Sequence, residues 1–379
     1  MNTKTTPSRR LASLDALRGF DLFFLVALGP IVTTFASAAD LAWLNDSMWM
    51  FRHFTWEGFS PWDLIMPLFL FMSGASIPYA LSKYKKGNNK KALAIHLARR
   101  VIILWILGMI CQGNLLGLDP HKIYLYSNTL QAIATGYLVT ALLFLFTSRR
   151  TQIITTASLL IAYWAAMQFI SVDGYGAGNY TTAHNLAEWV DRTVLGRFRD
   201  GASVIDGKVH FAEWYHYTWI LSSINFAATV MTGMFAGYIA KDPTNDKTKL
   251  RYYFFGGLAM IAIGKIWSIQ MPIIKPIWTS SMVLFSSGCS FILMGLFYYW
   301  IDCKGHQKKV EWLRVYGMNS IAAYMLAETF NFRALGTPLF HGLEQYIGPY
   351  YSFLLTVWNA AVIYMILLYM HKKRIYLKV

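Results

Sequence analysis

The sequence predicts an all-α protein with ten transmembrane helices, and two observations support this fold class. Apolar runs recur along the chain, each near the ~20 residues that cross a hydrocarbon core of ~30 Å. Charge is scarce: 56% of the 379 residues are hydrophobic and only 14% are charged. Soluble domains keep about a quarter of their residues charged. We therefore expect a polytopic helical membrane protein, with residues 1–379 forming a single transmembrane domain.

The apolar runs place the predicted spans, with edges good to a few residues. They cover residues 14–36, 61–82, 101–118, 128–148, 152–171, 217–240, 252–271, 277–300, 316–332 and 350–370. Because the number of spans is even, both chain ends fall on one side. The segments on that side hold 25 Lys and Arg residues, and the opposite loops hold eight. Basic residues are enriched in cytoplasmic loops, which predicts that both termini are cytoplasmic.

The longest polar stretch, residues 172–216, is then external. It reads as a glycine-rich loop followed by a short amphipathic helix, and we expect it to cap the mouth of a cavity. A second interpretation of the first span is a cleavable leader, since "MNTKTTPSRR" precedes an apolar run ending near "ASAA". Asp15, Arg18 and Asp21 interrupt the start of that run, which favours a retained helix.

The net charge of +15 raises the possibility of a nucleic-acid partner, but the basic residues gather in short loops between apolar runs. That distribution is typical of membrane orientation and predicts no nucleic-acid binding. The three cysteines, Cys111, Cys289 and Cys303, are far apart and form neither a disulfide framework nor a metal-spaced cluster. A single Glu-x-x-His in "HFAEWYH" is too weak a signal for a metal, and none is predicted.

The stretch "FRHFTWEGFSPWDLIMPLFLFMSG" (51–74) contains the strongest candidate for chemistry, His53. One interpretation is an interfacial histidine beside Trp56 and Trp62 in an aromatic belt. The other is a general base, because imidazole titrates near neutral pH. Pro61 and Asp63 suit the start of a helix, where proline and a carboxylate fit the free N–H groups. A turn there would hold His53 near the Asp63 carboxylate.

Ionisable groups inside spans are costly and are therefore functional candidates. Asp15 and Arg18 lie three residues apart on one helical face, either as a local ion pair or as part of a site. In "HLARR" (96–100), Arg99 and Arg100 either set the topology or clamp a phosphate. Several neutral polar groups also lie at span ends, where they either bond across helices or line a ligand site: Gln131, Trp278, Ser280, Ser281 and Asn319.

Taken together, the motifs resemble the heparan-α-glucosaminide N-acetyltransferase family, particularly its bacterial members. The resemblance covers residues 11 to about 330 and rests on five stretches in order: "SLDALRGFD", "HFTWEGFSPWDLIMPLFLFMSGASI", "TLQAIATGYL", "IWTSSMVL" and "GMNSIAAYML". It implies a transmembrane acyl transfer from cytoplasmic acetyl-CoA to a sugar amine on the far side. His53 matches the family's catalytic histidine.

The sequence also departs from the family. Lysosomal members carry a catalytic asparagine in the first span, where this chain has Gly29. They also carry an Asp-Pro-Glu-Gly stretch before the sixth span, where this chain reads "HYTWILSSINF" (216–226); Asn225 is a candidate substitute. These departures affect the identity of the acceptor more than that of the acyl donor.

The sequence therefore predicts an acetyl-CoA-dependent acyltransferase of the bacterial inner membrane. Arg18, Arg99 and Arg100 are expected to hold the phosphates of acetyl-CoA. Its pantetheine arm is expected to run past Gln131, Trp278, Ser280, Ser281 and Asn319. His53, oriented by Asp63, would act as base or transient acyl carrier toward an amine or hydroxyl of a saccharide. Homodimerisation stays open.

A transporter or flippase for a sugar or lipid-linked sugar is the alternative, because intramembrane polar residues and broken spans suit substrate passage as well. Transporters commonly contain repeats, and the sequence has no internal repeat of fixed period, which favours the enzyme.

Overall fold

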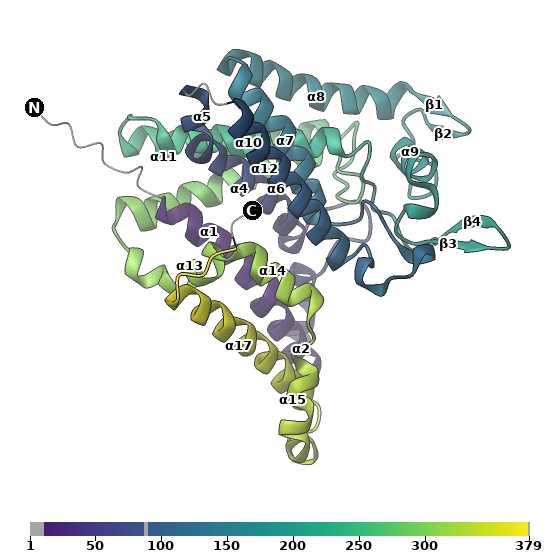
Figure 1. Cartoon of the computed structure of the whole chain (residues 1–379), viewed down its shortest axis with the longest axis vertical. Helices are drawn as coiled ribbons and strands as arrows, with labels where there is room; N and C mark the ends of the chain where they lie inside the picture. Colours follow the sequence, from purple (N-terminus) through teal and green to yellow (C-terminus); the bar gives the residue numbers. More distant parts are fainter. Residues whose placement is uncertain (1–10, 87–89, 378–379) are drawn as a thin grey trace, which may run out of the picture.

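The computed structural model describes residues 11–86 and 90–377 and confirms the all-α membrane fold (Figure 1). Within these residues, eight helical segments are long and apolar enough to cross a membrane. They are α1–η1–α2 (Ala12–Ala39), η3–α4 (Pro61–Ala80), α6 (Lys90–Cys111), α7 (Thr129–Phe146), α8 (Arg149–Phe169), α10 (Ser223–Lys241), α12–η7 (Ser280–Cys303) and α17 (Tyr350–Lys372). The other two predicted spans are occupied by α11 (Asp246–Trp267) and by the pair α13 (Glu311–Met318) and α14 (Ser320–Thr329).

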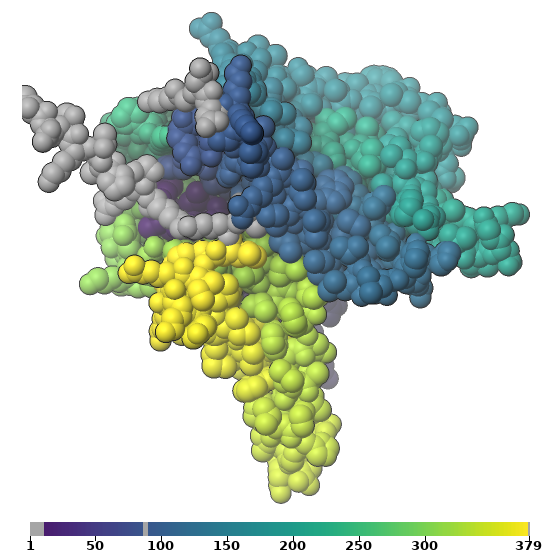
Figure 2. All heavy atoms as spheres, viewed as in Figure 1, coloured from purple at the N-terminus to yellow at the C-terminus, as the bar shows by residue number. Residues whose placement is uncertain are grey.

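Shorter elements connect these helices. The short α-helices are α3 (Ala42–Asp46), α5 (Ser82–Lys86), α9 (Leu186–Leu195), α15 (Arg333–Phe340) and α16 (Glu344–Ile347). Two antiparallel hairpins follow α8 and α9, one formed by β1 (Ser171–Val172) and β2 (Tyr175–Gly176), the other by β3 (Ala202–Ile205) and β4 (Lys208–Phe211). Figure 2 shows the segment around α15 projecting from the body of the molecule.

Four predicted spans differ from the observed helices, among them the seventh, which was expected from 252 but is occupied by α11, beginning at Asp246. The third was expected at 101–118, but α6 begins at Lys90, because its basic first half is rich in helix-forming Ala, Leu and Lys although it is not apolar. The sixth was expected from 217, but α10 begins at Ser223. The ninth breaks at Asn319, whose side-chain amide donates to Ile375 O at 3.0 Å and whose Oδ1 accepts from Leu377 N at 3.2 Å.

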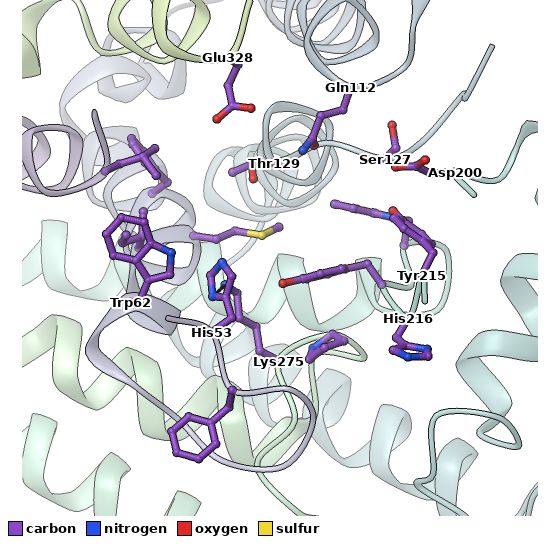
Figure 3. A pocket seen from close by; sticks show the side chains of 18 of the residues that line it. His53, Trp62, Gln112, Ser127, Thr129, Asp200, Tyr215, His216, Lys275 and Glu328 are labelled. Atoms are coloured by element: carbon purple, nitrogen blue, oxygen red, sulfur yellow. Dashed lines mark hydrogen bonds between the residues drawn. The ribbon is translucent and has the colours of Figure 1, made fainter. Parts of the chain in front are cut away.

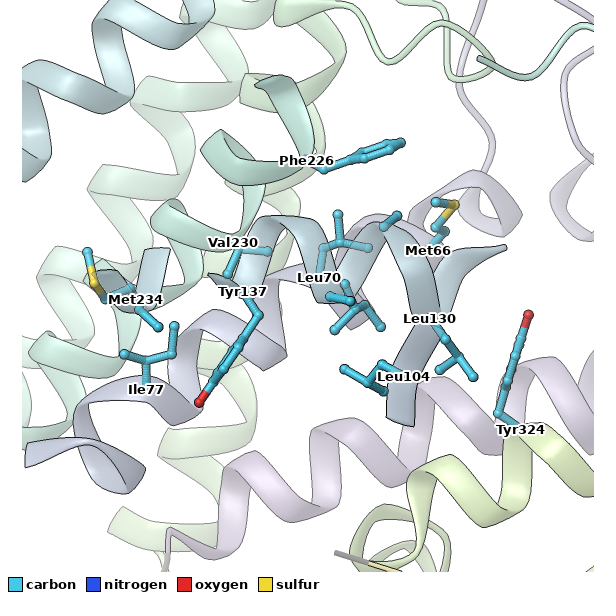
Figure 4. Close-up of a cluster of buried hydrophobic side chains, with 14 of the residues drawn as sticks. Met66, Leu70, Ile77, Leu104, Leu130, Tyr137, Phe226, Val230, Met234 and Tyr324 are labelled. Atoms are coloured by element: carbon cyan, nitrogen blue, oxygen red, sulfur yellow. The ribbon is translucent and has the colours of Figure 1, made fainter. Parts of the chain in front are cut away.

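The hydrophobic core lies where α4, α7 and α10 meet (Figure 4). Leu70 of α4, Ala134 of α7 and Val230 of α10 are fully buried there. Leu104 of α6 and Tyr324 of α14 extend the same cluster. Two of these three helices, α4 and α10, belong to the spans with the largest buried share.

Two helix pairs pack backbone against backbone through glycine. A Cβ added to Gly74 of α4 would lie 1.8 Å from Val230 O of α10, and one added to Gly233 of α10 would lie 1.8 Å from Phe71 O of α4. α1 and α13 repeat this arrangement, since a Cβ at Gly19 would lie 1.8 Å from Leu313 O. Small residues permit such close approach of membrane helices.

Residues 172–216 form an ordered unit around α9, at the end of the molecule where α8 finishes (Figure 1). Its buried Glu188 pairs with Arg192 at 2.7 Å and with Arg199 at 2.6 Å. Asp191 accepts hydrogen bonds from the backbone N–H groups of Trp219 at 2.8 Å and Ile220 at 2.9 Å. These bonds attach α9 to the segment that leads into α10.

Candidate active site

The sequence from Ser60 to Asp63 builds the start of a helix. Ser60 is the N-cap of η3 (Pro61–Leu64), and its hydroxyl oxygen accepts from Asp63 N at 3.2 Å. In return, Asp63 Oδ2 accepts from Ser60 N at 3.0 Å, which completes a capping box. Asp63 Oδ2 also accepts from Phe54 N at 3.2 Å. The carboxylate is thus fixed by backbone groups on both sides of the loop.

The second oxygen of Asp63 lies against the imidazole of His53, with Nδ1 and Oδ1 2.7 Å apart. A carboxylate oxygen has no proton to give, so this short contact requires the proton on Nδ1. The N–H group of Nδ1 therefore donates to Asp63, and Nε2 carries the free lone pair. The His53 side chain is 46% exposed, whereas the Asp63 side chain is 2% exposed. This arrangement leaves a basic nitrogen accessible from the cavity.

Lys275 completes a cluster of three ionisable groups. Its Nζ lies 3.4 Å from Asp63 Oδ1 and 3.1 Å from His53 Nδ1. Its side chain, at 6% exposure, is nearly as inaccessible as that of Asp63. Because Nδ1 already carries a proton directed at Asp63, the ammonium of Lys275 donates to the carboxylate and not to the ring.

The backbone holds these groups in register. Gly58, at φ +131°, takes a conformation that side-chain-bearing residues rarely adopt, and its N–H donates to Ile273 O at 2.9 Å. Glu57 and Ile274 form an isolated antiparallel bridge next to it. The loop before η3 is therefore joined to the α11–α12 connection, which carries Lys275.

Burial and neighbouring charges set the protonation of this cluster. Burial is the main cause that lowers the pKa of His53 below 6.5, and the nearby Lys275 charge adds to it, while Asp63 opposes both. Burial also lowers the pKa of Lys275 to about 8, against the opposing effect of Asp63. At neutral pH His53 is thus a neutral imidazole, the form that accepts a proton.

His53 opens into a cavity of about 750 Å³ at the end of the molecule that carries residues 172–216. In Figure 3, His53 and Trp62 face Tyr215 and His216 across it, and Glu328, Thr129 and Gln112 lie toward one end. The wall is rich in aromatic rings: Phe54, Trp62, Phe69, Trp214, Tyr215, Tyr217, Trp219 and Tyr324. The 172–216 unit contributes Asp200 and its last residues, 214–216, to this wall, and the segment that follows the unit contributes Tyr217 and Trp219.

A second cavity of about 390 Å³ contains the basic side chains of Arg18, His96 and Arg100. The guanidinium of Arg100 stacks 4.3 Å from the ring centre of Tyr137. Arg18 lies 3.8 Å from Asp15, which is the ion pair expected from their spacing.

The two cavities adjoin. Phe69, Thr129 and Tyr324 line both of them. Tyr324 is anchored by its hydroxyl, which accepts from the side-chain amide of Asn128 at 3.0 Å. The three common residues therefore form a wall between a cavity with basic side chains and a cavity with a histidine base.

Of the three predicted phosphate-binding arginines, Arg18 and Arg100 line the second cavity together. Arg99 does not line either cavity, and its side chain is exposed on a different face of α6. Neighbouring helical residues point about 100° apart, and here Arg100 faces the cavity while Arg99 points away from it.

The five polar residues expected along the acyl donor line neither cavity, because their side chains are engaged within the protein. Gln131 closes the capping box at the start of α7, accepting from Asn128 N at 3.1 Å. The Trp278 ring N–H donates to Thr229 Oγ1 at 3.0 Å. Further partners are Leu160 O for Ser280, Pro272 O for Ser281, and the backbone of 375–377 for Asn319.

The structure also brings residues to the site that the sequence did not single out. Lys275 reads in sequence as one more loop lysine, and only its position between Pro272 and Pro276 distinguishes it. Thr129 and Tyr324 come from separate helices and carry no local signal of a shared wall. Asn225, the candidate substitute for a missing acidic stretch, donates to Trp278 O at 2.7 Å and lines neither cavity.

No protein-family model matches the chain. The chain is similar to the heparan-alpha-glucosaminide N-acetyltransferase of Homo sapiens, with 26% identity over 372 residues that cover 85% of this chain and 53% of that protein. It is similar to the protein of the same name from Mus musculus, with 24% identity over 374 residues that cover 85% of this chain and 54% of that protein. The chain spans about half the length of the curated relatives it matches.

Proposed function

We propose that the chain belongs to the same family as the heparan-alpha-glucosaminide N-acetyltransferases to which it is similar, and that it is a transmembrane acetyltransferase. It takes the acetyl group of cytoplasmic acetyl-CoA and transfers it to an amine, or a hydroxyl, of a saccharide on the opposite face. As an integral membrane protein with cytoplasmic termini, it would reside in the inner membrane of a bacterium. The observation that carries this proposal is the pair of adjoining cavities, one with basic side chains and one with the His53 base.

The donor end rests on the second cavity. CoA is heavily phosphorylated and cannot cross lipid, so its phosphates must remain on the cytoplasmic side. Arg18 and Arg100 supply cationic, multiply donating groups for these phosphates. The pantetheine arm then extends along the wall formed by Phe69, Thr129 and Tyr324 and brings the thioester toward His53.

The acceptor end rests on the first cavity. Its aromatic rings offer flat apolar faces of the kind that pack against sugar rings, and Asp200 and Glu328 offer carboxylates to an acceptor amine. An acceptor that arrives as an ammonium ion first loses one proton to solvent. His53 Nε2 removes a proton from the acceptor nitrogen as that nitrogen attacks the thioester carbonyl carbon. The tetrahedral intermediate collapses, the C–S bond breaks, and the imidazolium returns the proton to the CoA thiolate.

Asp63 supports this step by accepting from Nδ1–H, which selects the tautomer of the neutral ring in which Nε2 carries the lone pair. A covalent route uses the same geometry: Nε2 attacks the thioester and CoA thiolate leaves. The acceptor amine then displaces the imidazole from acetyl-histidine, and the proton that the amine loses passes to the thiolate. Both routes need the same nitrogen.

The alternative of a transporter or flippase is favoured by one feature, the series of two cavities. The two functions separate in one experiment on purified protein in proteoliposomes. Acetyl-CoA and an amino sugar are supplied on opposite faces, and free thiol and acetylated sugar are measured together with sugar uptake. Thiol release matched by acetylated sugar supports the acetyltransferase. Uptake of unmodified sugar without thiol release supports transport and overturns the proposal.

A further inference from the structure

Lys275 lines the same cavity as His53, although its side chain is only 6% exposed. Its Nζ is 3.1 Å from His53 Nδ1, and Nδ1 is the ring nitrogen opposite the free Nε2. Its charge is partnered by Asp63 Oδ1 at 3.4 Å. Among the described residues, the close contacts of its ammonium are with Asp63 and with the Nδ1 side of the ring, so Lys275 can act on Nε2 through these two groups.

The physical effect of this placement follows from the signs of the charges. A carboxylate at 2.7 Å favours the imidazolium form of a histidine, so Asp63 raises the pKa of His53 against the effect of burial. A protonated imidazole cannot serve as a base. A second, positive charge close to the same ring opposes imidazolium formation and compensates the carboxylate. Here the ammonium and the carboxylate are both almost inaccessible, so bulk water screens them weakly.

We propose that Lys275 is a positioning residue that offsets the charge of Asp63 and thereby holds His53 neutral, with Nε2 free to accept a proton. The catalytic consequence rests on the proposed acetyltransferase function, but the electrostatic relation does not. In this proposal His53 remains the base, and the charge of Lys275 favours the neutral form of its imidazole.

Other ionisable groups around the cavity are less directly placed. Tyr217 comes from the segment before α10, Asp200 and His216 from the 172–216 unit and its end, and Glu328 from α14, whereas Asp63 comes from η3. Of these, only Asp63 is in direct contact with both His53 and Lys275 among the interactions of the described residues. The experiment therefore tests the opposing effects of the Asp63 and Lys275 charges on the pKa of His53.

The balance can be measured without turnover. Diethyl pyrocarbonate reacts with neutral imidazole, so the pH at which the reaction rate of His53 is half-maximal reports the protonation of its ring. The full-length protein in detergent is treated over a range of pH, and carbethoxylation is followed by mass spectrometry on the peptide that contains His53. We expect Lys275→Met to move the midpoint upward by about one to three pH units, because a charged neighbour within contact distance shifts a pKa by that amount.

Three further variants define the cause. Lys275→Arg keeps the positive charge and should leave the midpoint near that of the wild type. Lys265→Met removes an exposed lysine at the end of α11 and is the matched control, with no expected shift. The double variant Asp63→Asn with Lys275→Met removes both charges and should return the midpoint toward the wild-type value.

Asp63→Asn alone tests the relation from the other side, whether or not the Lys275 variants fold. With Lys275 unopposed, the midpoint should fall below that of the wild type. The inference is overturned if Lys275→Met, as a folded protein, has the wild-type midpoint, or if Asp63→Asn leaves the midpoint unchanged or raises it. If the midpoints move as expected but acetyl-CoA yields no thiol release, the electrostatic inference stands and the proposed acetyltransferase function fails.

Activity provides the second measurement. In the acetyltransferase assay, the acid limb of kcat/KM for Lys275→Met should move upward with the chemical midpoint, and Lys275→Arg should restore it. A purely structural lysine would lower activity at every pH without moving the limb.

Discussion

His53 and Asp63 are ten positions apart in the sequence, yet His53 Nδ1 lies 2.7 Å from Asp63 Oδ1. The other oxygen of the same carboxylate accepts from Ser60 N and Phe54 N. The helix start that contains Asp63 therefore sets the orientation of the imidazole ring before any substrate binds. Such preorganisation is what a base requires in order to act on a bound acceptor.

Replacing the base tests the centre of the proposal. His53→Ala should reduce acetyl transfer by roughly 10²–10⁴-fold, the usual contribution of a positioned base, or by more if the acetyl group passes through the histidine. CoA affinity should stay close to that of the wild type, because the proposed phosphate site lies in the other cavity. Both quantities are measured on one purified sample by thiol release and by calorimetric titration with CoA. Near-normal turnover would return His53 to an interfacial role, and loss of both quantities would indicate misfolding.

The phosphate site can be tested with two adjacent arginines. Arg100 lines the second cavity and Arg99 does not, so Arg100→Gln should raise the KM for acetyl-CoA while Arg99→Gln serves as the matched control. The expected rise is roughly 10- to 100-fold, from the loss of charge-assisted hydrogen bonds. Because uniform binding is removed, kcat should change little. Equal effects of the two substitutions would exclude a specific phosphate contact by Arg100.

The wall between the cavities predicts a separate effect on the chemical step. Thr129→Trp adds bulk to a residue that lines both cavities and should lower kcat by about 100-fold, because the thioester no longer reaches the base in productive geometry. Binding of CoA without the acetyl group should be less affected. Val139→Trp, at an exposed position of the same helix, is the control for folding and membrane insertion. A normal kcat in Thr129→Trp would mean that the donor does not pass this wall.

The predicted topology can be measured in intact cells. In a background without Cys111, Cys289 and Cys303, Ile205→Cys in the β3–β4 hairpin should react with a membrane-impermeant maleimide. Ile375→Cys should react only after the cells are permeabilised, because the basic-residue distribution places both termini in the cytoplasm. Both positions are exposed, so access is set by sidedness and not by burial. The opposite labelling pattern would show that the orientation in the membrane is the reverse of the predicted one, with the proposed phosphate site on the external face.

The pH dependence of the wild type follows from the protonation of His53. Burial lowers its pKa below 6.5, so the neutral base persists to lower pH than in an ordinary histidine. Below this pKa the imidazole is protonated and cannot accept a proton, so kcat/KM should fall on the acid side and reach a plateau by neutral pH. Rate measurements with an acceptor that does not itself titrate in this range, such as a sugar hydroxyl, isolate the limb. A midpoint well above 6.5 would contradict the described electrostatics.

The sequence predicted much of this arrangement because its main signals are local. Apolar length identifies membrane helices, and Pro61 with Asp63 after Ser60 marks a helix start. The helix edges were less predictable, because α6 continues through a basic segment that hydropathy does not register. Asn319 interrupts a span by holding the backbone near Ile375, which is a contact between distant parts of the chain.

The donor-site residues show the same limit. Adjacent arginines look equivalent in sequence, but only Arg100 faces a cavity. Polar side chains such as Gln131 and Ser280 were equally compatible with a ligand and with internal hydrogen bonds, and the structure gives them internal bonds. Lys275 approaches His53 only because the two loops pair through Gly58 and Ile273. A local sequence pattern carries no information about that pairing.

The glycine contacts between α4 and α10, and between α1 and α13, have a consequence for substrate choice. Backbones in direct contact resist sliding, which holds α4 against α10 and α1 against α13, and α1 and α4 also contact each other directly. Helix packing therefore sets the separation between Arg18 on α1 and Asp63 next to α4, the two ends of the site. Under the proposed function, the fixed separation between the phosphate site and the base selects donors by the length of the arm that carries the thioester. A thioester on a shortened arm would anchor at one end and fall short of the base, whereas one of full length reaches it. The protein would then recognise acetyl-CoA by its extent as much as by its chemical groups.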